Sequence, residues 1–273
     1  MIAAQSSILV VDDEPRVLDA VRRCLRPFRD EWEVTLATSA KEALDALASR
    51  PIDFLVTDMR MPEVGGIELL EQVRARHPRT VRVVLSGQTE FDAAMRSMAL
   101  AHQFLGKPCT PQAMLETIAA MRRALAWIDD RSVRDDLVAR TSLPSPPEAC
   151  AALERALAHD PSCTDAAADV VARDAAMSAK VLQVARSSFF GLRATTNDVR
   201  LAASQLGVGV LRALARDAIR SDAWPSGVEL GDAVTLADRV GALLRALVPA
   251  SRSLARAAVG ETVLRLWGIG AVG

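Results

Sequence analysis

The chain has 273 residues, half of them hydrophobic and a quarter charged, and domains usually hold about 150 residues, so we expect two domains. Its 33 basic residues are balanced by 34 acidic ones, which leaves no surplus of positive charge for a phosphate backbone and disfavours nucleic-acid binding. The four cysteines lack metal-binding spacing and are expected to be reduced thiols. No secretory signal and no apolar run of roughly 20 residues is present, so a cytoplasmic protein without membrane contact is expected.

The first half alternates short β-branched runs with longer helical periods, which predicts an α/β fold. Five βα units would form a doubly wound parallel sheet within residues 1–126. Helix starts are marked by Pro15, by Ser39 with Glu42 three residues later, and by Pro111. The predicted strands cover residues 8–11, 33–37, 52–57, 81–85 and 103–105.

The second half loses the strand pattern, and Ala, Leu and Arg recur there at helical spacing, which predicts an all-α domain at 143–273. A loop is predicted at 224–231 from its Pro and Gly content. The predicted helices cover residues 147–158, 164–173, 178–187 and 208–219.

The connection between the two domains, residues 127–142, is expected to be a helical linker. Leu115, Ile118, Leu125 and Ile128 lie at spacings of three and seven, which is compatible with one helix that runs out of the first domain and into the second. An ordinary last helix that ends near Trp127 fits the sequence equally well. Both alternatives remain open at this point.

Polar and charged residues follow four of the five predicted strands, where ligands bind in an open parallel sheet. Asp12 and Asp13 follow the first strand, Asp58 the third, Ser86 the fourth and Lys107 the fifth. Three uncompensated carboxylates repel one another, and their hard oxygen atoms suit Mg²⁺. With Lys107, the cation would offset the charge of an incoming phosphoryl group, and one carboxylate would act as the nucleophile.

This constellation resembles the receiver domain of two-component response regulators, which have a flavodoxin-like fold. The motifs that carry the resemblance are ILVVDDE at 8–14, VTDMRMPEVGG at 56–66, VLSG at 84–87 and FLGKP at 104–108. It implies that Asp58 accepts a phosphoryl group from a histidine kinase, and that Ser86 and Lys107 contact the phosphoryl oxygens. It also implies Mg²⁺ as cofactor, with Asp12, Asp13, Asp58 and the Arg60 carbonyl around it.

The same resemblance places Phe104 at the position of a switch aromatic that changes rotamer when Ser86 moves, although an aromatic in a last strand is as often simply core. It implies a cis Lys107–Pro108 bond. It also suggests a homodimer through the face made by residues 93–101, 103–105 and 111–126. The Arg60 side chain, two residues after Asp58, is a candidate for steering the water that attacks the phosphoryl group.

The second domain resembles the HDOD family, helical relatives of HD phosphohydrolases that lack their metal ligands. The resemblance rests on LPSPP at 143–147, on residues 159–191 and on AASQLGVGVLRAL at 202–214, with ETVLRLWGIG at 261–270 similar to a late segment of the family. It implies a non-catalytic module that binds an unidentified downstream protein. Phe189, Phe190 and Gly191 are interpreted as core and a tight turn, with an exposed partner-binding surface as the alternative.

Two other functions remain as alternatives. A nucleotide phosphohydrolase would need several His and Asp metal ligands, but the only histidines are His77, His102 and His159, so we expect no enzyme beyond self-phosphorylation. A DNA-binding regulator would need a basic recognition helix. Arg212, Arg216 and Arg220 share one helical face, but acidic neighbours favour a solvated surface.

Overall fold

The computed structural model describes residues 5–87, 96–159, 164–187, 198–217, 237, 240 and 256–266. The chain divides into two compact units, residues 1–120 and 121–273. Within the described residues, no helix is both long and apolar enough to cross a membrane. The predicted loop at 224–231 and the Phe189–Phe190–Gly191 turn lie outside the described residues.

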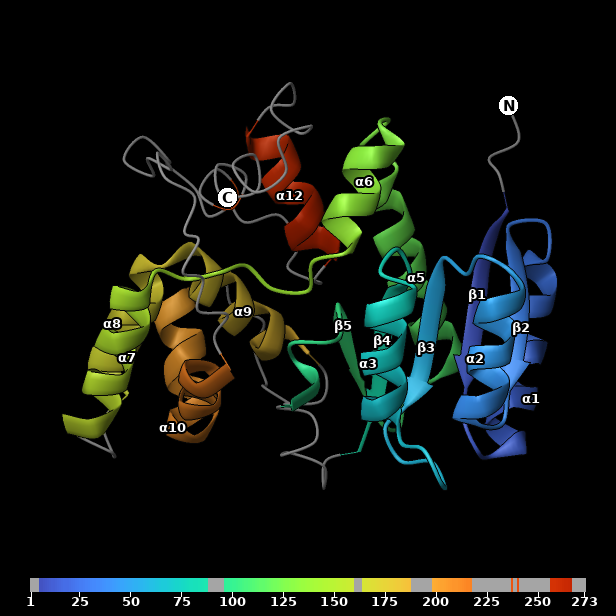
Figure 1. Cartoon of the computed structure of the whole chain (residues 1–273), viewed down its shortest axis with the longest axis horizontal. Helices are drawn as coiled ribbons and strands as arrows, with labels where there is room; N and C mark the ends of the chain where they lie inside the picture. The colour runs from blue at the N-terminus through green and yellow to red at the C-terminus, as the bar shows by residue number, and fades with distance from the viewer. Residues whose placement is uncertain are drawn as a thin grey trace. The chain divides into compact units, whose positions relative to one another are not determined.

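The first unit is a five-stranded parallel sheet in the order β2-β1-β3-β4-β5. The strand order reverses at β1, so the carboxyl ends of β1 and β3 flank the position where such sheets bind ligands. Figure 1 shows α2 and α3 on the near side of this sheet and α5 behind it. The strands are β1 (Ser6–Val11), β2 (Trp32–Ala37), β3 (Phe54–Asp58), β4 (Val81–Ser86) and β5 (Gln103–Gly106).

The three helix starts that the sequence predicts in this unit, at Pro15, after Ser39 and at Pro111, are confirmed. Pro15 opens α1, and the Ser39 hydroxyl caps α2 by accepting a hydrogen bond from the Glu42 amide at 3.2 Å. β1, β3 and β4 are buried on both faces, as expected for central strands covered by helices. The helical elements are α1 (Pro15–Leu25), the short 3₁₀ helix η1 (Arg26–Phe28), α2 (Ala40–Ser49), α3 (Gly66–Arg76) and α5 (Pro111–Leu125).

The regular secondary structure described in the second unit is almost entirely helical, and α10 packs against α7, α8 and α9. Every residue of α9 from Ala175 to Ala185 is buried, which makes α9 the central helix of the group. Its helices are α6 (Arg131–Val138), α7 (Pro147–His159), α8 (Asp165–Arg173), α9 (Ala175–Arg186), α10 (Val199–Asp217) and α12 (Arg256–Leu266).

One helix of the second unit starts three residues before its predicted start, and one helical stretch was not predicted. α9 begins at Ala175, not at residue 178, because the Asp174 carboxylate caps it by accepting a hydrogen bond from the Met177 amide at 2.8 Å. α10 is interrupted at Gly207, whose φ of +77° and ψ of 172° are not helical, so two helical stretches, 199–206 and 208–217, meet there. The predicted break at Leu206–Gly207 and the helix that starts at residue 208 are confirmed, whereas the helical stretch before Gly207 was not predicted.

The connector is not one continuous helix. α5 ends at Leu125, close to Trp127, and a separate helix α6 starts at Arg131. The Asp130 carboxylate caps α6 by accepting hydrogen bonds from the Ser132 and Val133 amides at 2.8 and 3.3 Å. Of the two alternatives, the structure has the helix that ends near Trp127.

Candidate functional site

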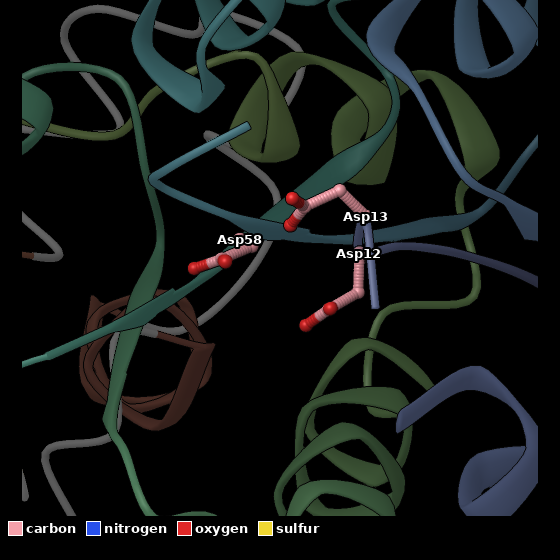
Figure 2. Close-up of side chains that lie close together, drawn as sticks. All are labelled: Asp12, Asp13 and Asp58. Carbon is pink, nitrogen blue, oxygen red and sulfur yellow. The ribbon is translucent and has the colours of Figure 1, made fainter. Parts of the chain in front are cut away.

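Three carboxylates gather at the carboxyl ends of two neighbouring strands. Asp12 and Asp13 follow β1, and Asp58 is the last residue of β3 (Figure 2). One carboxylate oxygen from each lies within 4.8 Å of the others; Asp12 and Asp58 are buried, whereas Asp13 is exposed. Hard oxygen ligands on one open side suit a divalent cation such as Mg²⁺ better than a soft metal. The three residues that the sequence predicted therefore do meet.

Lys107 completes the cluster from the end of β5. Its Nζ lies 2.8 Å from Asp58 Oδ2 and 3.3 Å from Asp12 Oδ2. Asp58 Oδ1 accepts a hydrogen bond from the Met59 amide at 2.7 Å, and Asp12 Oδ1 accepts one from the Glu14 amide at 2.9 Å. Both buried carboxylates are thus held in fixed orientations, one oxygen by the backbone and the other by the ammonium group.

Burial and charge act against each other in this cluster. Burial raises the pKa of Asp58, Lys107 acts to lower it, and Asp12 raises it further; the net pKa lies above the usual value. Burial acts to lower the pKa of Lys107, but the hydrogen bond and charge of Asp58, together with Asp12, outweigh it and raise the pKa. Lys107 therefore stays cationic beside the carboxylates, where a phosphoryl group would need positive charge.

Ser86 ends β4 and is fully buried. Asp58 is in register with Leu85, so Ser86 lies one residue further along the neighbouring strand, and its carbonyl accepts a hydrogen bond from the Lys107 amide at 2.8 Å. Ser86 is thereby brought to the same edge as the acidic residues.

Phe104 lies in β5, in register with Val84, and only 1% of its surface is exposed. Burial fits both a core residue and an inward switch aromatic, so its switching role stays a prediction. Arg60 is exposed just beyond Asp58, and ligation by its carbonyl likewise stays a prediction. The Lys107–Pro108 bond is cis, as expected.

Gly66 contributes to the site through its backbone, and it was not among the predicted site residues. A Cβ at this position would lie 2.2 Å from the Asp58 carbonyl oxygen and 2.9 Å from Met59 Cα. The Gly66 amide donates to the Met59 carbonyl at 3.0 Å. Only glycine therefore lets the start of α3 approach the end of β3 so closely. The paired glycines in VTDMRMPEVGG are the signal that could have found it.

The helical unit contains a second polar cluster, and it is enclosed. Lys180 Nζ donates hydrogen bonds to the Thr141 carbonyl at 2.8 Å and to Gln183 Oε1 at 2.7 Å. Ser145 Oγ donates to Asp174 Oδ1 at 2.8 Å. Burial lowers the pKa of Lys180 from 10.5 to about 7. These bonds tie the segment before α7 to α9.

Two of the three histidines belong to the first unit. His102 is fully buried there, its Nδ1 accepts a hydrogen bond from the Arg82 amide at 3.0 Å, and His77 is the C-cap residue that follows α3. His159 is the last residue of α7. Within the described part of the chain, Asp12, Asp13 and Asp58 form the one group that could hold a metal ion.

Two family models match the chain, one for each half. The response regulator receiver domain matches residues 8–119, and the HDOD domain matches residues 143–240. The hydrogenase transcriptional regulatory protein HoxA of Cupriavidus necator is 37% identical over 142 residues, 51% of this chain and 29% of HoxA. The response regulator protein PilR of Pseudomonas aeruginosa is 31% identical over 44% of this chain and 27% of its own length. The chain thus spans under a third of these relatives.

Solved receiver domains are also similar to the chain. The signal receiver domain of an HD domain-containing protein from Pseudomonas fluorescens Pf-5 is 27% identical, with a TM-score of 0.40, over 45% of this chain and 96% of that one. The parallel sheet in the order β2-β1-β3-β4-β5 is the predicted doubly wound receiver fold. With both family models in the expected order, the chain is a response regulator in which a receiver domain precedes an HDOD domain.

Proposed function

We propose that a histidine kinase phosphorylates Asp58, and that the phosphorylated receiver controls the HDOD domain, which binds another protein in the cytoplasm and catalyses no reaction. The observation that carries the proposal is the Asp58 carboxylate, oriented by the Met59 amide and 2.8 Å from Lys107 Nζ. A buried carboxylate beside a cation and two further acids is suited to in-line attack on phosphorus.

Each side chain has a separate task in this proposal. An Asp58 oxygen attacks phosphorus while the bond from phosphorus to the donor nitrogen breaks. Lys107, already cationic, neutralises the charge that the transferred group brings, and Ser86 offers a hydroxyl at the same edge. Asp12, Asp13 and Asp58 would hold Mg²⁺, which when bound offsets the phosphoryl charge. Arg60 would add its carbonyl to that set and remains the candidate for steering water.

Phosphorylation is tested with acetyl phosphate and Mg²⁺ on the full chain. Asp58→Asn keeps the shape of the side chain but removes the nucleophile, so we expect labelling to fall to background in a phosphate-affinity gel. Asp45→Asn, on the exposed face of α2, is the matched control and should label like the wild type. Undiminished labelling of Asp58→Asn would contradict the assignment.

Mg²⁺ binding is tested by titration of the Asp13→Ala variant. Asp13 is the exposed carboxylate of the cluster and has no structural hydrogen bond among those described, so the fold should tolerate its removal. Loss of one charged ligand should weaken Mg²⁺ binding by at least about tenfold. An unchanged titration would mean that Asp13 only precedes α1 and binds no metal.

The non-catalytic role of the HDOD domain is supported by the histidine count, because none lies beyond His159. A metal pair of the HD type needs several such ligands. We therefore expect no turnover of cyclic dinucleotides by the full chain with Mg²⁺ or Mn²⁺. Metal-dependent hydrolysis that persists in Asp58→Asn would favour the phosphohydrolase alternative.

A further inference from the structure

The segment that leaves α5 carries an exposed tryptophan. Trp127 lies two residues after the end of α5, and 63% of its surface is exposed. The Trp127 and Ile128 amides continue the turn by donating to the Ala124 and Leu125 carbonyls at 3.3 and 3.2 Å. Trp127 is therefore fixed to the last turn of α5 and must move with it.

The Trp127 ring is covered by a cation from the last described helix. Arg265 Cζ of α12 lies 5.2 Å from the ring centroid, which is cation–π distance. Glu261, one turn earlier on α12, accepts hydrogen bonds from Arg265 Nε at 3.1 Å and from Nη2. The guanidinium is thus oriented by α12 itself, and its free face is available to the indole.

This contact lies at the edge of apolar packing on both sides. Ile128, the neighbour of Trp127, is 3% exposed. On α12, Leu264 and Leu266 flank Arg265 in the sequence, and both are almost completely buried. Trp127 is exposed and Arg265 is partly exposed, and each is flanked by buried neighbours that anchor its segment. Their contact can therefore break and re-form without unfolding either segment.

We propose that Trp127 and Arg265 couple the end of α5 to α12, so that α12 is the element of the helical unit that responds to a change in the receiver. This inference rests on the proposed function, because it needs a receiver that changes on phosphorylation. α12 lies some 130 residues after Trp127 in the sequence, yet the contact joins them directly. The signal therefore does not need to pass through α6 and the segment before α7.

An exposed cation–π contact is modest, and such a contact shifts an equilibrium by about two- to fivefold. That range suits a graded response. Phosphorylation can shift the contact only by as much as it changes the relative stability of the two receiver conformations. Trp127 and Arg265 are positioning residues in this scheme. Neither lies in the phosphorylation site.

The test is hydrogen exchange on the full chain, with Mg²⁺ alone and with Mg²⁺ plus beryllofluoride as the phosphoryl mimic. In the wild type we expect the exchange rates of amides 256–266 to change by about two- to fivefold. Trp127→Ala and Arg265→Ala should abolish that change while the response around Asp58 and Lys107 is retained. Trp127→Phe and Arg265→Lys keep a ring and a cation, and should restore most of it.

Two matched controls separate coupling from general loosening. Leu201→Ala removes another large exposed apolar side chain, on α10, and Arg155→Ala removes an exposed arginine on α7. Both should leave the response of 256–266 intact. The inference is wrong if that segment does not respond in the wild type although the receiver loops do, or if its response survives Trp127→Ala and Arg265→Ala. A wild type whose receiver loops ignore beryllofluoride would instead refute the proposed function.

Discussion

The receiver unit and the helical unit each hold a lysine in a polar cluster, and the pKa values of the two lysines shift in opposite directions. Lys107 faces two carboxylates at the open edge of the sheet, and its pKa is raised. Lys180 faces a carbonyl and an amide oxygen inside α9, and its pKa falls to about 7. The partners of each lysine explain the difference. Two carboxylates raise the pKa of the part-exposed Lys107, whereas burial beside uncharged oxygen atoms lowers the pKa of Lys180.

A substitution that adds one methyl group should affect the two units in opposite ways. In Gly66→Ala the new Cβ would lie 2.2 Å from the Asp58 carbonyl oxygen, so the backbone under the site must shift. We expect a loss of stability of about 3 kcal/mol, the upper range for overpacking, together with slower labelling from acetyl phosphate. Chemical denaturation followed by circular dichroism measures the first effect.

Gly209→Ala is the matched change on α10, where an added Cβ meets no atom within 4 Å. Because alanine has the higher helix propensity, stability should rise by about 0.5–1 kcal/mol. Equal effects of the two substitutions would show that the receiver edge is no more tightly packed than the surface of the helical unit.

The lowered pKa of Lys180 should make the free energy of unfolding depend on pH. The pKa of Lys180 is about 7 in the folded chain and 10.5 for an ordinary lysine, so between these values the unfolded state binds the extra proton. Its contribution to the free energy of unfolding therefore rises with pH by about 1.4 kcal/mol per unit within the window from 7 to 10.5. Below pH 7 the burial cost is present in full and the contribution is flat.

Lys180→Met should remove this slope, and Lys41→Met is its control because Lys41 is exposed and paired with Asp45. The measurement is the difference in unfolding free energy between wild type and each variant at pH 7, 8 and 9. If the unfolding free energy of Lys180→Met changes with pH as that of the wild type does, Lys180 stays protonated in the folded chain. The pKa values of Lys180 and Lys107 would then not shift in opposite directions.

The same contrast explains how far the sequence could predict the molecule. The strand-end residues Asp12, Asp58 and Lys107 were predicted to meet because carboxyl ends of parallel strands share an edge, and they do. The start of α9 was placed three residues too late, because Asp174 is both the C-cap of α8 and the N-cap of α9, so the helical pattern runs from one helix into the next with a single residue between them. Gly66 was missed as a site residue because its role is the space it leaves, which only the backbone path reveals.

The packing of the helices in the second unit was harder to predict than the arrangement of the strands in the sheet, for a physical reason. Alternating strands and helices constrain each other through the crossover rule, whereas helices rich in alanine and leucine are compatible with several packings. Lys180 illustrates this, since nothing in the sequence distinguishes a lysine buried on α9 from one on a solvated face. The Thr141 carbonyl that it binds lies 39 residues earlier in the chain.

The smallest expected difference in stability is between the removal of two helix caps, one from each unit. Ser39 caps α2 through a single 3.2 Å hydrogen bond from the Glu42 amide at an exposed position. Asp174 caps α9 at 7% exposure, and the same oxygen, Oδ1, accepts bonds from the Met177 amide and Ser145 Oγ. Ser39→Ala should cost about 1 kcal/mol. Asp174→Ala should cost about 2–3 kcal/mol, because it leaves a buried amide and a buried hydroxyl without their acceptor.

Asp174→Asn separates the contribution of hydrogen bonding to this cap from the contribution of the negative charge. The amide oxygen of asparagine can still accept from Met177 and Ser145, so a cap that acts through hydrogen bonding is largely preserved. We expect Asp174→Asn to recover more than half of the loss seen in Asp174→Ala, measured as the denaturation midpoint of the full chain at pH 7. If instead the asparagine variant is as unstable as the alanine variant, the negative charge of Asp174 matters beyond its hydrogen bonds. The helical unit would then depend on buried charge in the way that the receiver edge does.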